Sequence, residues 1–361
     1  MLEKLINPFI KDLPVYEPGK PVQELERESG ISGAIKLASN ENPLGPSPSV
    51  IKALTEAALG VHIYPVGDCF YLKRTLAEKL GICCGQLIFG NGSDEIIALV
   101  CQAFLSPGDE VIYAYPAFIE YELISRAFGA KCRRIPLRNF THDLPAMAAA
   151  VHAETKLIFI ANPNNPTGTT VDKNQFADFM RGLPGHVIAV VDEAYYEFVA
   201  TDDFPDSIEY IRQGAQLIVM RTFSKAYALA GLRIGYGIAD AQIIQYLNRV
   251  RHPFNVNSLA QSAAIAALQD EAHLIRTRRT IDQGRACLSQ ELERLGLEYV
   301  PSAVNFILLK VGQGQRIYQA LLRKGVIVRA MDCYDLPEYI RVTVGTQGEN
   351  TRFIEALREV L

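Results

Sequence analysis

Short apolar runs alternate with stretches of helical period along most of the chain. Between residues 96 and 103, apolar side chains recur at i, i+3, i+4 and i+7, which predicts a helix that begins near Ser93. The apolar, β-branched runs themselves predict strands at residues 86–90, 110–114, 156–161, 187–191, 216–221 and 234–238. Strands that alternate with helices predict an α/β fold with a large, doubly wound, mainly parallel sheet.

After about residue 258 the pattern changes to longer helices, predicted at residues 258–269 and 271–295. A strand-like run at 306–311 and a last helix from Asn350 follow them, which predicts a second, smaller α/β domain. The chain of 361 residues is also longer than a single core usually allows. An Ala-rich helix is expected at 147–153, and the Pro/Gly-containing segment VYEPGKP predicts that the first 40 residues form an arm draped over the body. We expect residues 1–45 to form this arm and part of the small domain, 46–265 the large domain, and 266–361 the small one.

Composition narrows the range of partners. The net charge is -4, with 49% hydrophobic and 21% charged residues and no basic run, so a small-molecule partner is expected rather than nucleic acid or a membrane surface. The charged, proline-containing start does not resemble a signal peptide, and the apolar runs are shorter than the roughly 18 residues of a membrane span. A cytoplasmic protein is therefore expected. Seven scattered cysteines and six isolated histidines predict reduced thiols and no metal site.

Polar residues that follow the predicted strands are the first candidates for chemistry, because ligands of open α/β sheets bind beyond the carboxyl ends of the strands. After the run at 86–90, the sequence GNGSD leads into a helix whose free N–H groups could cradle a phosphate. Taken alone, this segment is as well explained by a simple turn with Ser93 as the N-cap. After the run at 156–161, NPNNPTG carries turn residues throughout, and its rigid backbone could aim an amide side chain at a ligand.

Two further strand ends carry ionisable groups. Asp192 directly follows a buried strand, although an isolated aspartate there is more often solvated or a helix cap. Lys225 lies between a strand and the apolar segment 226–232, which leads to Arg233. Desolvation at such a place lowers the pKa of an amine and makes it a nucleophile. A phosphate cradle, an aimed amide, a carboxylate and a lysine match the needs of pyridoxal phosphate, which forms a Schiff base with lysine and needs a protonated pyridine nitrogen.

The motifs around these residues resemble those of the histidinol-phosphate aminotransferase family, whose members have the type I fold of pyridoxal-phosphate enzymes. The resemblance runs from about Val15 to the C-terminus. It rests on ASNENPLGPSP (38–48), YPVGDCFYLK (64–73), FGNGSDE (89–95), ANPNNPTGT (161–169), VDEAYYEF (191–198), RTFSKAYALAGLRIGYG (221–237), PFNVNSLAQ (253–261) and IRVTVGT (340–346). The family often has Thr in place of Ala117, in YPAFIEY, and Gln in place of His252.

This resemblance implies roles for individual residues. Lys225 would hold the cofactor and act as the general base and acid, and the region 46–265 would be the cofactor-binding domain. The other cofactor contacts would be Asp192 to the pyridine nitrogen, Asn165 and Tyr195 to the phenolic oxygen, Phe118 on the ring, and Ser93, Asp94, Ser224, Arg233 and the other subunit's Tyr64 to the phosphate. Substrate would contact Tyr16, Asn42, Arg329 and Arg341. A homodimer with shared active sites is expected.

The resemblance implies transfer of an amino group between histidinol phosphate and 2-oxoglutarate, in histidine biosynthesis. An aromatic amino-acid aminotransferase and, behind it, a threonine-phosphate decarboxylase are the alternatives within the fold. A cofactor-binding DNA regulator would need a helix-turn-helix domain, for which the first 40 residues leave no room. A nicotinamide dehydrogenase would need G-x-G-x-x-G after a strand with an acidic residue about 20 positions later, and no predicted strand has this pattern.

Overall fold

The computed structural model describes residues 2–16 and 19–361. Its largest sheet has seven strands, which are parallel except that β8 runs antiparallel to both of its neighbours. In spatial order they are β2 (Leu87–Gly90), β8 (Gly235–Ala239), β7 (Leu217–Thr222), β6 (Ile188–Asp192), β5 (Thr155–Ala161), β3 (Glu110–Tyr115) and β4 (Lys131–Pro136). The prediction of a large, mainly parallel sheet is thus confirmed, as are all six strands to within about one residue at each end.

The edge strand β4 was not predicted, and its composition explains why. Four of the six side chains in KCRRIP are exposed to solvent and three of the six residues are basic, so the strand has no apolar run. It joins the sheet through parallel pairing with β3 alone. An edge strand of this kind is held by its backbone hydrogen bonds rather than by burial, and hydrophobic periodicity does not detect it.

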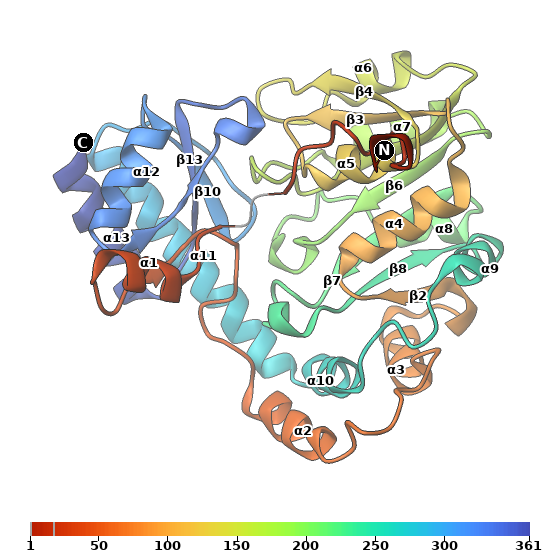
Figure 1. Cartoon of the computed structure of the whole chain (residues 1–361), viewed down its shortest axis with the longest axis horizontal. Coiled ribbons are helices and arrows are strands. Elements are labelled where there is room, and N and C mark those ends of the chain that lie inside the picture. Colours follow the sequence, from red (N-terminus) through yellow and green to blue (C-terminus); the bar gives the residue numbers. More distant parts are fainter. Residues whose placement is uncertain (1, 17–18) are drawn as a thin grey trace.

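Helices cover both faces of this sheet (Figure 1). The first half of the chain contributes α1 (Val22–Ser29), α2 (Pro48–Ala58), α3 (Phe70–Leu80), α4 (Ser93–Phe104), α5 (Glu120–Ala127), α6 (Leu144–Ala149) and α7 (Lys173–Gly182). The second half contributes α8 (Ser207–Arg212), α9 (Ala241–Val250), α10 (Ser258–Gln269), α11 (Glu271–Arg294), α12 (Gly314–Arg323) and α13 (Gln347–Val360). Of these helices, α1, α12 and α13 pack in the second, smaller α/β part of the molecule rather than on this sheet (Figure 1). Short 3₁₀ turns occur at Leu2–Lys4, Cys84–Gln86, Tyr196–Phe198, Ala230–Leu232 and Asp332–Tyr334.

Side-chain alternation along the strands divides the interior into two cores. Ile112, Ile158 and Val191 contribute to one hydrophobic cluster, whereas Val111 and Phe159 belong to the other. The second cluster includes side chains of α4, α5 and α9, and the first includes those of α6, α7, α10 and α11. Because both faces are covered, the central strands are buried throughout, as the continuous apolar runs predict.

Two helices begin earlier than predicted because of their N-terminal caps. The last helix starts at Gln347 rather than Asn350, since Thr346 and Glu349 form a capping box. The Ala-rich helix covers Leu144–Ala149 rather than 147–153, because the Asp143 carboxylate accepts a hydrogen bond from the Ala146 N–H. In both cases the cap, rather than the composition of the helix, determines where the helix begins.

A smaller antiparallel sheet has the strand order β12 (Arg329–Ala330), β13 (Tyr339–Thr343), β10 (Phe306–Lys310) and β9 (Tyr299–Val300). The N-terminal region joins this part of the molecule through β1 (Ile35–Lys36), which pairs with β11 (Val326–Ile327). Beyond β1, the Leu37 carbonyl accepts a hydrogen bond from the Thr343 N–H at 2.8 Å. Earlier in the chain, Phe9 packs against Gly129 at the end of α5, where Figure 1 also shows the N-terminus.

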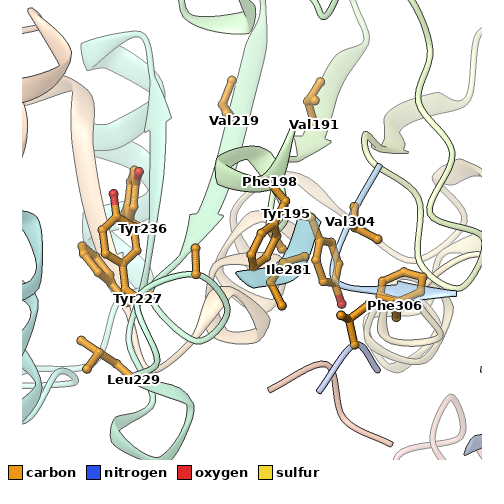
Figure 2. Close-up of a cluster of buried hydrophobic side chains, with 14 of the residues drawn as sticks. Val191, Tyr195, Phe198, Val219, Tyr227, Leu229, Tyr236, Ile281, Val304 and Phe306 are labelled. Atoms are coloured by element: carbon orange, nitrogen blue, oxygen red, sulfur yellow. The ribbon is translucent and has the colours of Figure 1, made fainter. Parts of the chain in front are cut away.

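The two sheets share one hydrophobic cluster. Tyr195, which follows β6, packs edge-on against Phe306 of β10 with ring centroids 5.3 Å apart. Figure 2 shows these two rings together with Ile281 of α11 and Val304, which precedes β10. The shared core fixes the end of β6 against the smaller sheet. The boundaries expected between the arm, the large domain and the small domain, at residues 46 and 266, remain predictions. No helix in residues 2–16 and 19–361 is long and apolar enough to cross a membrane.

Candidate active site

A cavity of about 260 Å³ lies at the carboxyl ends of β5, β6 and β7. Ten of the predicted site residues line it: Tyr16, Ser93, Asp94, Phe118, Asn165, Asp192, Tyr195, Ser224, Lys225 and Arg233. A larger hollow of about 560 Å³, lined among others by Arg138, His142 and Asp172, contains none of the predicted residues. The smaller cavity is therefore the candidate active site.

Four predicted residues do not line this cavity. Asn42 lies behind its wall, where its side-chain amide donates to the Ala226 carbonyl beside Lys225. Arg341 also lies behind the wall and donates to the Asn165 side-chain oxygen. Arg329 lies on the strand next to Arg341, with the two residues paired across β12 and β13. Tyr64 is 79% exposed and stacks on Phe254, so it does not contribute to the cavity of its own chain.

Lys225 follows β7, and its amine points into the cavity. The Nζ atom donates to the Ser39 carbonyl at 3.0 Å and lies 5.6 Å from the centre of the Tyr195 ring. Burial of the amine, helped by the positive charge of Arg341, lowers the pKa of Lys225 to about 8. A substantial fraction of the amine is therefore neutral near physiological pH, as a nucleophilic lysine requires.

Asp192 ends β6 and is also buried. Its Oδ2 accepts a hydrogen bond from the Tyr121 hydroxyl at 2.6 Å, and its Oδ1 accepts one from the Ala194 N–H at 3.0 Å. Burial raises the pKa of Asp192 to about 6, and these two hydrogen bonds oppose the rise. The carboxylate thus remains mostly ionised at neutral pH and is held at a defined orientation, so it suits a cationic partner.

The N-terminus of α4 forms an open cradle with Arg233. A Cβ atom at Gly92 would lie 2.5 Å from the Arg233 guanidinium, and one at Gly235 would lie 2.5 Å from the Ser93 nitrogen. Gly92 also has φ +91°, a conformation that favours glycine. Without side chains, Gly92 and Gly235 allow Arg233 and β8 to lie close to the N-terminus of α4, whose free N–H groups suit an anion. The Arg233 guanidinium is 2.9 Å from Asp94 Oδ2 at this position.

Arg341 is 93% buried, since only 7% of its surface is exposed. Its guanidinium donates to Asn165 Oδ1 and to the Ala38 carbonyl, the latter at 2.8 Å. Its Nε atom has no hydrogen-bond partner among the residues that the structure describes. A buried guanidinium with this geometry is suited to an anionic group of a ligand.

Several residues around the cavity were not predicted from the polar residues that follow strands. Tyr121 holds Asp192, the Ser39 carbonyl holds Lys225, and the Asn40 amide donates to the Tyr195 hydroxyl at 2.8 Å. Glu41 also lines the cavity. Ser39, Asn40 and Glu41 follow no strand of the large sheet, and Tyr121 lies six residues beyond the end of β3. Their segments, ASNENPLGPSP and YPAFIEY, were indicated only by the resemblance.

A buried ion pair supports the strands that carry Asp192 and Lys225. The Glu193 carboxylate is 2.7 Å from the Arg221 guanidinium, which also lies 3.6 Å above the Tyr196 ring. Both charged side chains are at least 95% buried. Because Glu193 follows Asp192 and Arg221 lies in β7, the pair links the ends of the two strands. An unpaired charge at this depth would cost several kcal/mol, so the pairing constrains the site firmly.

Comparison with known proteins places this arrangement in a class. The sequence model of the family described as aminotransferase class I and II matches residues 32–357. The chain is 50% identical to a histidinol-phosphate aminotransferase of Moorella thermoacetica over 96% of its length and 90% of that protein. It is 47% identical to one of Akkermansia muciniphila over 100% of its length and 99% of that protein. The chain therefore belongs to the histidinol-phosphate aminotransferase family of class I and II aminotransferases.

A solved structure agrees with this assignment. The histidinol-phosphate aminotransferase of Sinorhizobium meliloti in complex with pyridoxal-5'-phosphate superimposes with a TM-score of 0.91. It is 30% identical, and the match covers 98% of this chain and 97% of that chain. The family depends on pyridoxal phosphate. The cavity fits this cofactor, because the glycine-lined cradle suits a phosphate, Asp192 suits a protonated ring nitrogen, and Lys225 supplies an amine with a lowered pKa.

Labelling of the apoprotein with trinitrobenzenesulfonate should reveal the lowered pKa of Lys225. Only the neutral amine reacts, so the rate at Lys225 should reach half its maximum near pH 8 instead of the roughly 10.4 of an exposed lysine. Mass spectrometry of the peptide that carries Lys225 gives this rate. In Arg341→Gln the midpoint should move to higher pH, because a nearby positive charge is lost. A midpoint above pH 10 in the unaltered protein would contradict the assignment.

Proposed function

We propose that this enzyme transfers the amino group of histidinol phosphate to 2-oxoglutarate, in either direction, as a step of histidine biosynthesis in the cytoplasm. The observation that carries the proposal is the single cavity in which Lys225, Asp192 and the α4 cradle converge, with the Arg341 guanidinium directly behind Asn165. The strong similarity to histidinol-phosphate aminotransferases along the whole chain supports the choice of substrate.

When bound, the cofactor would supply an electron sink for the carbon that bears the transferred amine. Asp192 maintains the proton on the ring nitrogen, and Tyr121 orients the carboxylate that does so. Asn165 and Tyr195 donate hydrogen bonds to the phenolic oxygen. The Asn40 amide, 2.8 Å from the Tyr195 hydroxyl, orients that group.

The remaining cofactor contacts hold it in place. Phe118 packs on the face of the ring, and its own ring meets Tyr121 edge-on with centroids 5.7 Å apart. The backbone at Ser93 and Asp94 binds the phosphate together with the Ser224 hydroxyl and the Arg233 guanidinium. In the loaded enzyme, the Lys225 amine would take the proton from the substrate carbon that bears the amine and would deliver it to the cofactor carbon that receives the amino group.

Substrate recognition in this proposal depends on cationic and polar groups near Asn165. Arg341 binds the phosphate of histidinol phosphate and the α-carboxylate of glutamate, which occupy the same place. Arg329, on the adjacent strand, adds a second positive charge. Tyr16 lines the cavity and donates its hydroxyl to the phosphate, while Asn42 holds the backbone beside Lys225.

We also propose a homodimer with shared active sites. Large apolar side chains cluster in the segment that contains Tyr64, where Leu59 is 84% exposed and Ile63 is 64% exposed. Val61, Phe70 and Tyr71 add to this surface. Monomeric proteins rarely expose so much apolar surface in one segment. A second copy would cover it and would bring the partner's Tyr64 to the phosphate site.

Borohydride reduction tests whether Lys225 is the lysine that binds the cofactor. The purified protein should be yellow, and borohydride should attach the cofactor irreversibly to Lys225. Lys225→Ala should still bind cofactor noncovalently, because the phosphate cradle remains, but it should lose turnover of histidinol phosphate with 2-oxoglutarate. Parallel assays with phenylalanine and threonine phosphate distinguish the two alternative activities. Substantial turnover by Lys225→Ala would refute the assignment of the base.

Assembly should be coupled to cofactor binding. Dilution to monomer should release both cofactor and activity, because each phosphate site would lose the partner's Tyr64. Tyr64→Phe provides a matched variant, since it keeps the apolar surface but removes the hydroxyl; we expect an intact dimer with weaker cofactor affinity. Sedimentation and absorbance of the cofactor measure both quantities. A fully active, cofactor-saturated monomer would contradict the proposal.

Replacement of Arg341 should affect substrates rather than the cofactor. A hydrogen bond to a charged group contributes roughly 1.5 to 3 kcal/mol. The loss of a bidentate pair should therefore lower kcat/KM about a hundredfold to ten-thousandfold in both half-reactions of Arg341→Ala. Arg341→Lys should lose less, since it keeps the charge without the fork. Stopped-flow absorbance measures each half-reaction, and Arg316→Ala, at an exposed position of α12, is the control. Unchanged rates with histidinol phosphate would show that the anion binds elsewhere.

A further inference from the structure

Three carboxylates line the cavity in the described part of the chain, and two of them have a role in the proposed mechanism or beside its phosphate cradle. Asp94 pairs with Arg233, and Asp192 accepts the Tyr121 hydrogen bond. The third, Glu41, has no role in the proposed mechanism. A partly exposed carboxylate inside a site that binds anionic substrates needs an explanation, because it repels the groups that Arg341 attracts.

The backbone around Glu41 is anchored on both sides. On one side, the Asn40 N–H donates to the Thr343 hydroxyl at 2.9 Å, and the Asn40 carbonyl accepts from the Asn305 amide at 3.0 Å. On the other side, the Asn42 amide donates to the Ala226 carbonyl at 2.9 Å. Asn40 also has φ +55°, a left-handed conformation that asparagine tolerates better than most other non-glycine residues. Glu41 is therefore presented to the cavity from a rigid segment.

The Glu41 side chain is held as well as its backbone. The Lys36 amine is 2.9 Å from Glu41 Oε1, and the side chain of Glu41 nevertheless remains 44% exposed. Oε2 makes no hydrogen bond in the described structure. The negative charge also acts on the reaction centre, since Glu41 opposes the lowering of the Lys225 pKa. The carboxylate is thus oriented by Lys36 and exposed to a hydrogen-bond donor in the cavity.

We propose that Glu41 determines substrate specificity by accepting a hydrogen bond from the imidazole ring of the amino donor. This inference rests on the proposed function. Histidinol phosphate has a phosphate at one end and an imidazole N–H at the other, on either side of the carbon that bears the amine. Arg341 attracts the phosphate and Glu41 repels it, so the two side chains orient the substrate. An imidazole N–H donates to a carboxylate whether the ring is neutral or protonated, and such charge-assisted bonds are strong.

The test measures the energetic coupling between Glu41 and the imidazole ring. Single-turnover rates are measured for the unaltered enzyme and for Glu41→Gln, each with histidinol phosphate and with phenylalaninol phosphate, in which a phenyl ring replaces the imidazole. Glu41→Gln should lower kcat/KM roughly tenfold to a hundredfold with histidinol phosphate, because a neutral amide oxygen replaces the charged acceptor of the imidazole hydrogen bond. It should change the rate with phenylalaninol phosphate little. The glutamate half-reaction should not become slower, because a carboxylate that repels the glutamate side chain has been removed.

Two control variants separate this effect from general damage. Lys36→Met removes the partner of Glu41 but leaves the carboxylate, so discrimination between the two phosphates should persist. Glu298→Gln breaks an exposed ion pair between Glu298 and Lys310, neither of which lines the cavity. This variant should behave like the unaltered enzyme. Equal losses with both phosphates in Glu41→Gln, or no loss with either, would overturn the inference. Failure of the unaltered enzyme to use histidinol phosphate would instead overturn the proposed function.

Discussion

Burial of the central strands on both faces is the constraint on which the rest of the structure depends. Strands β5, β6 and β7 send alternate side chains into two separate cores, so charged groups are confined almost entirely to the strand ends. Lys156, near the start of β5, and Arg221, near the end of β7, are the charged residues inside these strands, and Glu193 neutralises Arg221. The same burial moves the pKa of Asp192 upward and that of Lys225 downward. A single physical cause therefore concentrates the reactive groups at one edge and adjusts their protonation for proton transfer.

Sequence patterns predicted the parts of the fold in which local composition and burial agree. The six buried strands were visible as apolar runs, and Asp192 and Lys225 were visible because they end two of those runs. Edge strand β4 lacked this signal, because its side chains face solvent. The starts of α6 and α13 were misplaced because a single capping side chain decides them.

Contacts between distant segments were beyond the reach of any local pattern. Asn40 meets Tyr195 across 155 residues of chain, and Arg341 meets Asn165 across 176 residues. Only folding brings the Tyr121 hydroxyl to Asp192, and only folding places Glu41 in the cavity wall. The resemblance indicated these segments but did not assign these contacts. They depend on the positions of the side chains in the folded protein, which the sequence motifs do not describe.

The hydrogen bond from Lys225 to the Ser39 carbonyl has a mechanical consequence. Ser39 belongs to a short connector whose preceding residues pair with β11 through β1 and bond to the smaller sheet through the Leu37 carbonyl and the Thr343 N–H. An amine engaged elsewhere no longer donates to Ser39, and the connector then loses one of its attachments to the larger sheet. The chemical state of one nitrogen atom therefore decides whether this bond acts beside those from Asn40 to Tyr195 and from Asn42 to Ala226, which hold the same connector.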